Sequence, residues 1–122
     1  MGTLLVCDFN SGFQIPEMVK RRPVVVISPK ISARAGLCTV VPLSTSRPSP
    51  KRDYHYRLDL DPPLPEPWNR GETWVKGDMV AAVGFNRLDF IRYGRDPSSQ
   101  RRYRFGRITD EQLRNIRRCV LS

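Results

Sequence analysis

The sequence predicts a mainly β protein: a small barrel or strongly bent sheet of antiparallel strands, closed by one C-terminal α-helix. Short runs rich in Val, Leu and Ile recur between turn-forming residues, as they do in all-β domains. Helical periodicity is confined to the end of the chain. Because 122 residues are enough for one modest core, we expect a single domain over residues 1–122.

Three apolar segments predict the central strands. They are 3–9 (TLLVCDF), 23–28 (PVVVIS) and 37–43 (LCTVVPL), each rich in residues that favour strands and bounded by turn formers. The segment 54–60 (YHYRLDL) instead alternates apolar and polar residues with a period of two. This alternation predicts a strand with one face in water, and His55 lies on that wet face.

A further strand is predicted over 73–83 (TWVKGDMVAAV). Gly77 interrupts it, which indicates a bulge or a close approach of another part of the backbone. Between this strand and the preceding one lies 61–71 (DPPLPEPWNRG), which contains too many prolines for regular structure and predicts a loop.

The end of the chain carries the helix signals. The segment 109–120 (TDEQLRNIRRCV) opens with a Thr-x-x-Gln capping box formed by Thr109 and Gln112. Leu113, Ile116 and Val120 then fall on one helical face. We therefore expect an amphipathic helix that closes the apolar side of the sheet.

The charge balance points to a polyanionic partner. Lys and Arg total 21 against 12 Asp and Glu, which gives a net charge of +9 and a pI near 10.2. Most of the cations are Arg, whose planar guanidinium matches phosphate better than an ammonium does. Nucleic acid is the partner that this composition favours, and general solubility is the alternative reading.

Cysteine and histidine content argues against a metal site. Cys7, Cys38 and Cys119 lie far apart among apolar neighbours, so we expect buried free thiols in a reducing cytoplasm. With His55 as the single histidine, the usual Cys/His zinc cluster cannot form. We expect no metal and no other cofactor.

The first residues fit neither a signal peptide nor a membrane span, which predicts a cytoplasmic protein.

The order of the segments resembles the MazF/PemK (Kid-like) family of toxin endoribonucleases from type II toxin–antitoxin systems. The matching stretches are VCDFNSG (6–12), PEMVKRRPVVVIS (16–28), CTVVPLSTS (38–46) and WVKGDMV (74–80), followed by Arg87-Leu88 and the closing helix. An Arg-Pro pair before an apolar strand is the most specific of these elements. The resemblance implies the small SH3-like barrel that this family shares with the CcdB gyrase poisons. It also implies a homodimer, metal-independent cleavage of single-stranded RNA, and an acidic cognate antitoxin.

Site residues follow from the same resemblance, position by position. The family's Arg before the Pro matches Arg22, and its hydroxyl residue after the third strand matches Ser44, with Thr45 beside it. An Arg-x-Asp pair that serves as acid and base in the Kid-like branch matches Lys76 and Asp78, where lysine replaces arginine. The catalytic set implied by the resemblance is Arg22, Ser44, Thr45, Lys76 and Asp78. A histidine that assists catalysis in that branch corresponds to Pro16 here.

The predicted RNA-binding residues lie in two segments. Glu17 matches an acidic residue five places before the family's Arg, and Lys20 and Arg21 adjoin Arg22. The segment 92–107 interleaves arginines with aromatic residues, the means by which proteins hold single strands. Its candidates are Arg92, Arg95, Arg101, Arg102 and Tyr103. The alternative reading of this segment is a solvated loop.

Elementary chemistry agrees with these assignments. RNA is cut without metal when its 2′-OH attacks the adjacent phosphorus, which requires a base, a proton donor for the 5′-oxygen, and cations on the phosphorane. Arg22 can supply the cation, and Ser44 or Thr45 can donate to a phosphate oxygen. The alternatives for these residues are a strand-flanking charge for Arg22, a local turn for Ser44 and Thr45, and an ion pair for Asp78. At the level of function, the alternatives are a CcdB-like topoisomerase poison and a non-catalytic RNA-binding barrel.

Overall fold

The structure is a computed structural model, and it describes residues 2–10, 20–28, 36–60, 63–69, 71–95, 101–104 and 106–121, with the backbone alone at 92–95 and 101–104. In chain order the elements are β1 (Thr3–Asp8), β2 (Arg21–Val26), β3 (Leu37–Ser44), β4 (His55–Arg57), β5 (Trp74–Lys76), the 3-10 helix η2 (Gly77–Met79), β6 (Ala81–Gly84), the 3-10 helix η3 (Phe85–Arg87), β7 (Leu88–Asp89), β8 (Ile91–Arg95), β9 (Arg101–Arg104), β10 (Gly106–Arg107) and α1 (Asp110–Val120).

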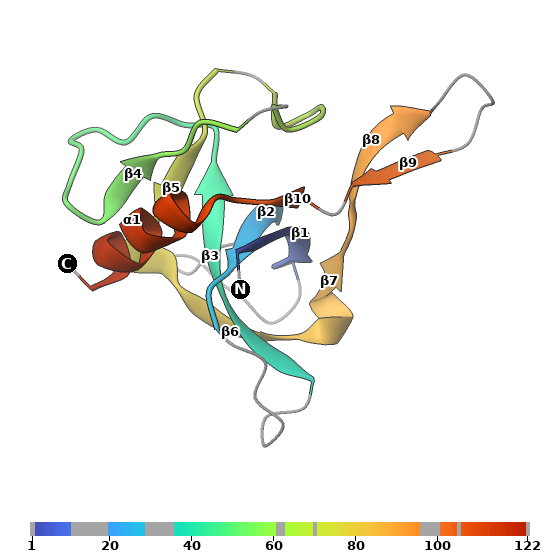
Figure 1. Cartoon of the computed structure of the whole chain (residues 1–122), viewed down its shortest axis with the longest axis horizontal. Helices are drawn as coiled ribbons and strands as arrows, with labels where there is room; N and C mark the ends of the chain where they lie inside the picture. Colours follow the sequence, from blue (N-terminus) through green and yellow to red (C-terminus); the bar gives the residue numbers. More distant parts are fainter. Residues whose placement is uncertain are drawn as a thin grey trace.

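The main sheet is antiparallel, in the order β10-β1-β2-β3-β5-β4. Two strands leave this path, since β6 pairs with β3 and β7 pairs with β1. Because η3 separates β6 from β7 and these strands pair with different neighbours, the sheet bends strongly without closing. The prediction of a mainly antiparallel β fold with a C-terminal helix is confirmed, and "barrel" describes it only loosely (Figure 1).

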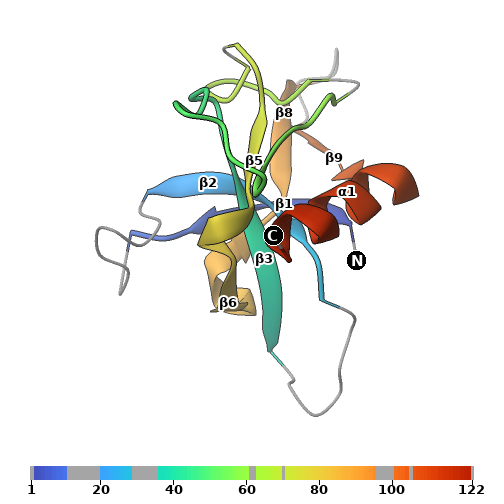
Figure 2. The same ribbon diagram turned by 90° about the vertical axis from the view of Figure 1, so that its left-hand side faces the viewer.

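Alternate residues of the central strands feed two separate cores. Val25, Val41 and Val75 point to the side of the sheet that packs against Leu113 and Ile116 of α1. We call this side the α1 face. On the other side, which we call the open face, a smaller core contains Cys7, Phe9, Val24, Val40 and Val83. Figure 2 shows α1 and β6 on different sides of β3.

Helix α1 begins as predicted. The Gln112 backbone N–H donates to Thr109 Oγ1 at 3.1 Å, and the Thr109 N–H donates to Gln112 Oε1 at 2.9 Å, which completes the capping box. Leu113 and Ile116 are buried, and Val120 packs at the margin of the same core. No helix within the described residues is both long and apolar enough to span a membrane.

Two predicted strands are shorter than expected. The strand predicted over 54–60 is regular only in β4, because the carbonyl of Asp59 instead accepts a hydrogen bond from Gln112 Nε2 at 2.6 Å. His55 is half-buried, and its Nδ1 accepts from the Arg52 N–H at 3.0 Å. The strand predicted over 73–83 is divided into β5 and β6 by η2. The loop prediction for 61–71 holds for its described residues.

Strands β8 and β9 form an antiparallel pair, which we call the β8–β9 hairpin, that the sequence did not predict. Strands β8 and β9 pair with each other and with no strand of the main sheet, within the described ranges. Ile91 is fully buried and anchors the hairpin to the main core. Figure 1 shows the hairpin projecting from the rest of the chain.

Gly77 lies where the start of η2 passes between two other segments. A Cβ atom built at this position would lie 2.7 Å from the carbonyl oxygen of Tyr54 and 3.1 Å from the carbonyl carbon of Cys119. The Gly77 N–H also donates to the Tyr54 carbonyl at 2.8 Å. The close backbone approach predicted at Gly77 is therefore confirmed, and it packs the C-terminal end of α1 against the turn that carries Asp78.

Replacement of this glycine should separate the two segments. We expect Gly77→Ala to lower the free energy of unfolding by about 2 kcal/mol, because the added methyl group overpacks a contact made by backbone atoms. Gly36→Ala is the matched control. Its Cβ would meet nothing within 4 Å, so only the strain of its φ of +82° should lower stability, by about 1 kcal/mol. Urea denaturation of both variants checks this. Equal losses of unfolding free energy in the two variants would show that the close contact at Gly77 adds no cost of its own.

Candidate functional site

A row of directly opposed residues crosses the open face. Cys7 pairs with Arg22, Ser44 with Trp74, and Trp74 with Arg57. The β2–β3 register pairs Val24 with Pro42 and, continued by two residues, sets Arg22 opposite Ser44. Directly opposed residues of antiparallel strands project from the same face. We name the set Cys7, Arg22, Ser44, Trp74 and Arg57 the first row.

A second row lies two residues further along the strands on the same face. It contains Leu5, Val24, Pro42, Lys76 and His55, where Pro42 and Lys76 are matched by continuing the β3–β5 register. Lys76 is thus one strand away from β3 and roughly 7 Å further along it than Ser44, from the rise of two strand residues. Asp78 follows on η2 and is exposed. The predicted catalytic residues on β2, β3 and β5 therefore share one face of the sheet.

Arg22 stands at a rigid entry to β2. The ring of Pro23, the residue that follows Arg22, fixes its own φ angle, and Pro23 is fully buried, so the backbone at the start of the strand is restricted. Lys20, two residues earlier, has a φ of +76°, a left-handed conformation that is uncommon for a residue with a side chain. Its carbonyl accepts a hydrogen bond from the Phe9 N–H at 3.0 Å. The backbone around Arg22 is thus tied to β1, and Arg22 itself is half-buried.

Ser44 is the buried polar residue of the site, at 5% exposure. Its Oγ accepts a hydrogen bond from the Ser46 N–H at 3.1 Å. This is the local turn contact that the sequence offered as an alternative role. The contact occupies a lone pair and leaves the hydroxyl hydrogen able to donate, so both roles are compatible. Thr45 is half-buried beside it.

The two arginines before Pro23 differ in their surroundings. Arg21 is exposed, and its Nη2 lies 3.7 Å from Asp89 Oδ2 in an ion pair between two half-exposed side chains. Arg22 projects from the opposite side of β2, in the first row. Lys20 is exposed at the turn before them. Arg21 therefore lies in an ion pair on one side of β2, and Arg22 lies in the first row on the other side.

The surroundings of the cysteines do not favour the nucleophilic thiolate form. All three are free; Cys7 and Cys119 are buried and Cys38 is half-buried. Burial raises the pKa of the Cys7 thiol to about 11, although the Arg87 guanidinium acts in the opposite direction. Burial likewise raises the pKa of Cys38 and of Cys119. Near neutral pH these side chains remain thiols, which are poor nucleophiles. The prediction of free thiols is confirmed.

Several predicted RNA-binding residues lie outside what the structure describes. Glu17 falls in the segment 11–19, which is not among the described residues. For the hairpin the structure gives only backbone register, in which Arg92 pairs with Tyr103 and Arg95 with Arg101. Arg102 lies between these partners on β9. The roles of these side chains remain predictions.

Sequence reasoning assigned no role to two members of the first row, Trp74 and Arg57. Arg57 was recognisable only as a polar residue on the wet side of the segment 54–60. Trp74 was read as one apolar residue of a strand. Trp74 and Arg57 are linked to Ser44 and Arg22 by the register of β2, β3, β5 and β4. This register cannot be read from a local sequence pattern.

The arrangement suits the electrostatics of phosphate. A half-buried guanidinium beside a buried hydroxyl can bind an anionic oxygen by two donors, and Lys76 adds a third, cationic donor on the same face. Within the described residues, no group of three or more His, Cys, Asp or Glu side chains is arranged to hold a metal ion.

The chain is similar to one protein family over its whole length. The sequence profile of PemK-like, MazF-like toxins of type II toxin–antitoxin systems matches residues 1–122. The YifN protein of Escherichia coli (strain K12) is 32% identical over an alignment of 145 residues, which covers 100% of this chain and 89% of YifN.

Solved structures share the fold at lower identity. An endoribonuclease from a mycobacterial species, solved in complex with its cognate antitoxin, superposes with a TM-score of 0.62 at 18% identity, covering 98% of this chain and 87% of that one. MazF from Deinococcus radiodurans gives a TM-score of 0.62 at 17% identity, covering 98% and 89%. Together with the match of the family profile over the whole length, these likenesses identify the chain as a member of the PemK-like, MazF-like toxins of type II toxin–antitoxin systems.

Proposed function

We propose that this protein is an endoribonuclease toxin that cleaves single-stranded RNA without a metal ion, by attack of a 2′-OH on the adjacent phosphate. The observation that carries the proposal is the register that brings Arg22 and Ser44 together on one face, at the positions implied by the resemblance. Family membership and a net charge of +9 support an RNA substrate.

Arg22 is the residue that we assign to the phosphorane. Negative charge builds on the non-bridging oxygens as the 2′-oxygen attacks, and a fixed guanidinium stabilises it through two parallel N–H donors. Ser44, held by the Ser46 N–H, donates its hydroxyl hydrogen to a phosphate oxygen. Thr45 is the neighbouring hydroxyl that could share this role.

Lys76 and Asp78 are the proposed proton-transfer pair. Asp78 takes the proton from the 2′-OH, and Lys76 gives one to the departing 5′-oxygen, so that the products are a 2′,3′-cyclic phosphate and a 5′-hydroxyl. The turn η2 carries Asp78 and begins at Gly77, which the end of α1 contacts. The helix thus supports the position of the pair without touching RNA.

The function is tested by incubating the purified protein with a long RNA in excess EDTA and mapping the ends. We expect cleavage at defined sites, with cyclic phosphate ends, and no cleavage where the 2′-OH at that site is replaced by hydrogen. Intact RNA that is nevertheless bound with steep salt dependence would favour the non-catalytic RNA-binding protein. Intact RNA together with inhibition of a topoisomerase would favour the CcdB-like poison.

Arg22→Lys tests the role of the guanidinium. The substitution keeps the charge but loses the planar pair of donors, so we expect the cleavage rate to fall on the order of 10²-fold while RNA binding changes little. Arg21→Lys is the matched control, since its partner Asp89 can pair with an ammonium equally well. Single-turnover cleavage and thermal melts of both variants check this. Equal, mild effects would reduce Arg22 to a strand-flanking charge.

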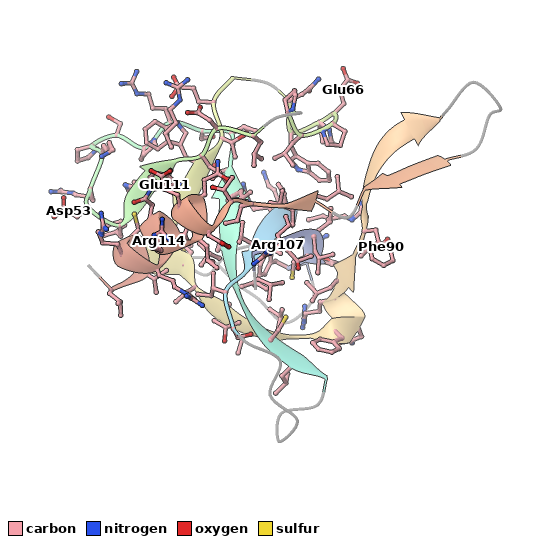
Figure 3. The ribbon with its side chains drawn as sticks, in the orientation of Figure 1. Asp53, Glu66, Phe90, Arg107, Glu111 and Arg114 are labelled. Atoms are coloured by element: carbon pink, nitrogen blue, oxygen red, sulfur yellow. The ribbon has the colours of Figure 1, made fainter. Side chains whose placement is uncertain are left out.

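Two protein partners follow from the same proposal. Apolar side chains exposed on the described surface, among them Leu37, Phe85 and Phe90, support a homodimer that covers part of them; Phe90 lies on the connection between β7 and β8 (Figure 3). The excess of cations supports an acidic antitoxin that binds the RNA-binding surface. The antitoxin that accompanies one structural neighbour is consistent with this.

Sedimentation velocity tests both partners in one series. At micromolar concentration we expect the protein to run at twice its mass of 14.1 kDa, and saturating antitoxin to displace labelled RNA from it. A species at the monomer mass would contradict the homodimer. RNA that stays bound in the presence of excess antitoxin would contradict a shared surface.

A further inference from the structure

Strands β7 and β10 are two parts of one interrupted edge strand. Both pair antiparallel with β1, β7 opposite residues 6–7 and β10 opposite residues 3–4. Leu5 lies between these two stretches of β1, so the β8–β9 hairpin leaves and rejoins the edge strand at a single position. The hairpin is therefore an insertion into the edge of the main sheet.

The hairpin projects from a fixed base. Ile91, at the start of β8, is fully buried in the core of the α1 face. Within the described ranges, β8 and β9 pair only with each other. Figure 1 shows both strands extending away from the main sheet. The backbone thus forms a free-standing ribbon of two strands, oriented by its buried first residue.

Positive charge is concentrated in this insertion. Residues 91–105 contain five arginines and one aspartate, which give a net charge of +4 out of +9 for the whole chain. The two strands themselves contain no acidic residue. An element that projects and carries this charge is suited to a polyanion.

The register divides the arginines between the two faces of the ribbon. Arg92 is opposite Tyr103 and Arg95 is opposite Arg101, and directly opposed residues share a face. We call this the outer face, because the other face carries Ile91, which is buried in the core. Arg102 and Arg104 belong to the inner face, since Arg104 is opposite Ile91.

The shape of the ribbon favours a double helix over a single strand. Proteins hold single strands in a charged groove that follows the backbone, whereas this hairpin is a projecting element with two faces (Figure 1). The major groove of B-form DNA is about 12 Å wide and admits a two-stranded ribbon. The five residues of β8 extend roughly 17 Å, the length of about five base pairs. The major groove of A-form RNA is too narrow to be read in this way.

We propose that the β8–β9 hairpin binds duplex DNA, with its outer face in the major groove. The arginines of that face contact phosphates and base edges. The hairpin leaves the sheet at the edge of β1, whereas Ser44 and Lys76 lie on β3 and β5. Binding of DNA by the hairpin is a function separate from cleavage of RNA, and it does not depend on the proposed cleavage.

Fluorescence anisotropy with three probes tests this function. The probes are a DNA duplex of about 20 base pairs, an RNA duplex of the same sequence, and a single-stranded 2′-O-methyl RNA of the same length, which cannot be cleaved. We expect the DNA duplex to bind on the order of tenfold more tightly than the RNA duplex, because only the B-form groove admits the ribbon. Equal affinities for the two duplexes would show that charge alone is recognised and would overturn the proposal.

The paired substitution Arg95→Gln with Arg101→Gln removes two opposed cations from the outer face. We expect affinity for the DNA duplex to fall on the order of tenfold, and the slope of log K against log salt to become shallower by about 1.8, the value for two phosphate contacts on B-form DNA. The loss of affinity for single-stranded RNA should be smaller. An equal or larger loss for single-stranded RNA would assign the hairpin to RNA and refute the proposal.

Two pairs of substitutions that remove the same charge are the controls. Arg102→Gln with Arg104→Gln alters the inner face of the same ribbon. Arg114→Gln with Arg118→Gln alters exposed residues of α1, away from the hairpin (Figure 3). Both pairs should reduce DNA affinity less than the outer-face pair does, and thermal melts of all variants check the fold.

The outcomes for DNA and for RNA are independent. Equal losses of DNA affinity in the outer-face pair and the two control pairs would refute the hairpin as the binding element, as would an unaltered protein that does not bind the DNA duplex. In either case the proposed function keeps its own cleavage test. An unaltered protein that binds the DNA duplex through the outer face but leaves RNA intact would support the hairpin proposal and contradict the proposed endoribonuclease.

Discussion

The register of β3 is the constraint on which both the cores and the candidate site depend. β3 pairs with β2 along one edge and with β5 and β6 along the other. Val40 and Val41, adjacent on this strand, enter different cores. A slip of one residue would exchange the two faces. It would carry Ser44 into the apolar core beneath α1 and take it away from Arg22. The same register therefore determines both the two cores and the first row.

Local sequence patterns were sufficient to predict the start of the C-terminal helix and the central strands. The start of α1 follows from the capping box at Thr109, and the central strands follow from their Val-rich runs. Gly77 was recognisable because a glycine inside a strand pattern commonly marks a bulge or a close backbone approach. The short strands β7 and β10 were missed because each is defined by its pairing with a distant segment. The β8–β9 pair was missed because its arginine-rich strands lack the apolar runs by which the other strands were recognised.

The candidate site could be predicted only residue by residue. Arg22, Ser44 and Lys76 were identified through resemblance, but their common face follows from pairings between segments that lie far apart in the sequence. The total charge likewise carries no information about where each cation lies. It treats Arg21 and Arg57 alike, although one pairs with Asp89 on the β7 side and the other ends the polar row at the opposite edge. The net charge favours a polyanionic partner, and the register shows which of the described cations share one face of the sheet.

The left-handed backbone of Lys20 carries a cost in stability at the entry to β2. A lysine at φ +76° holds a conformation that costs on the order of 1–2 kcal/mol, which glycine would adopt without strain. Selection for heat resistance alone would therefore favour glycine at this position. Glycine would keep the backbone hydrogen bond to Phe9, but it would remove the exposed ammonium from the turn that leads to Arg21 and Arg22. Selection for stability alone would thus exchange a surface cation beside the candidate site for a less strained turn.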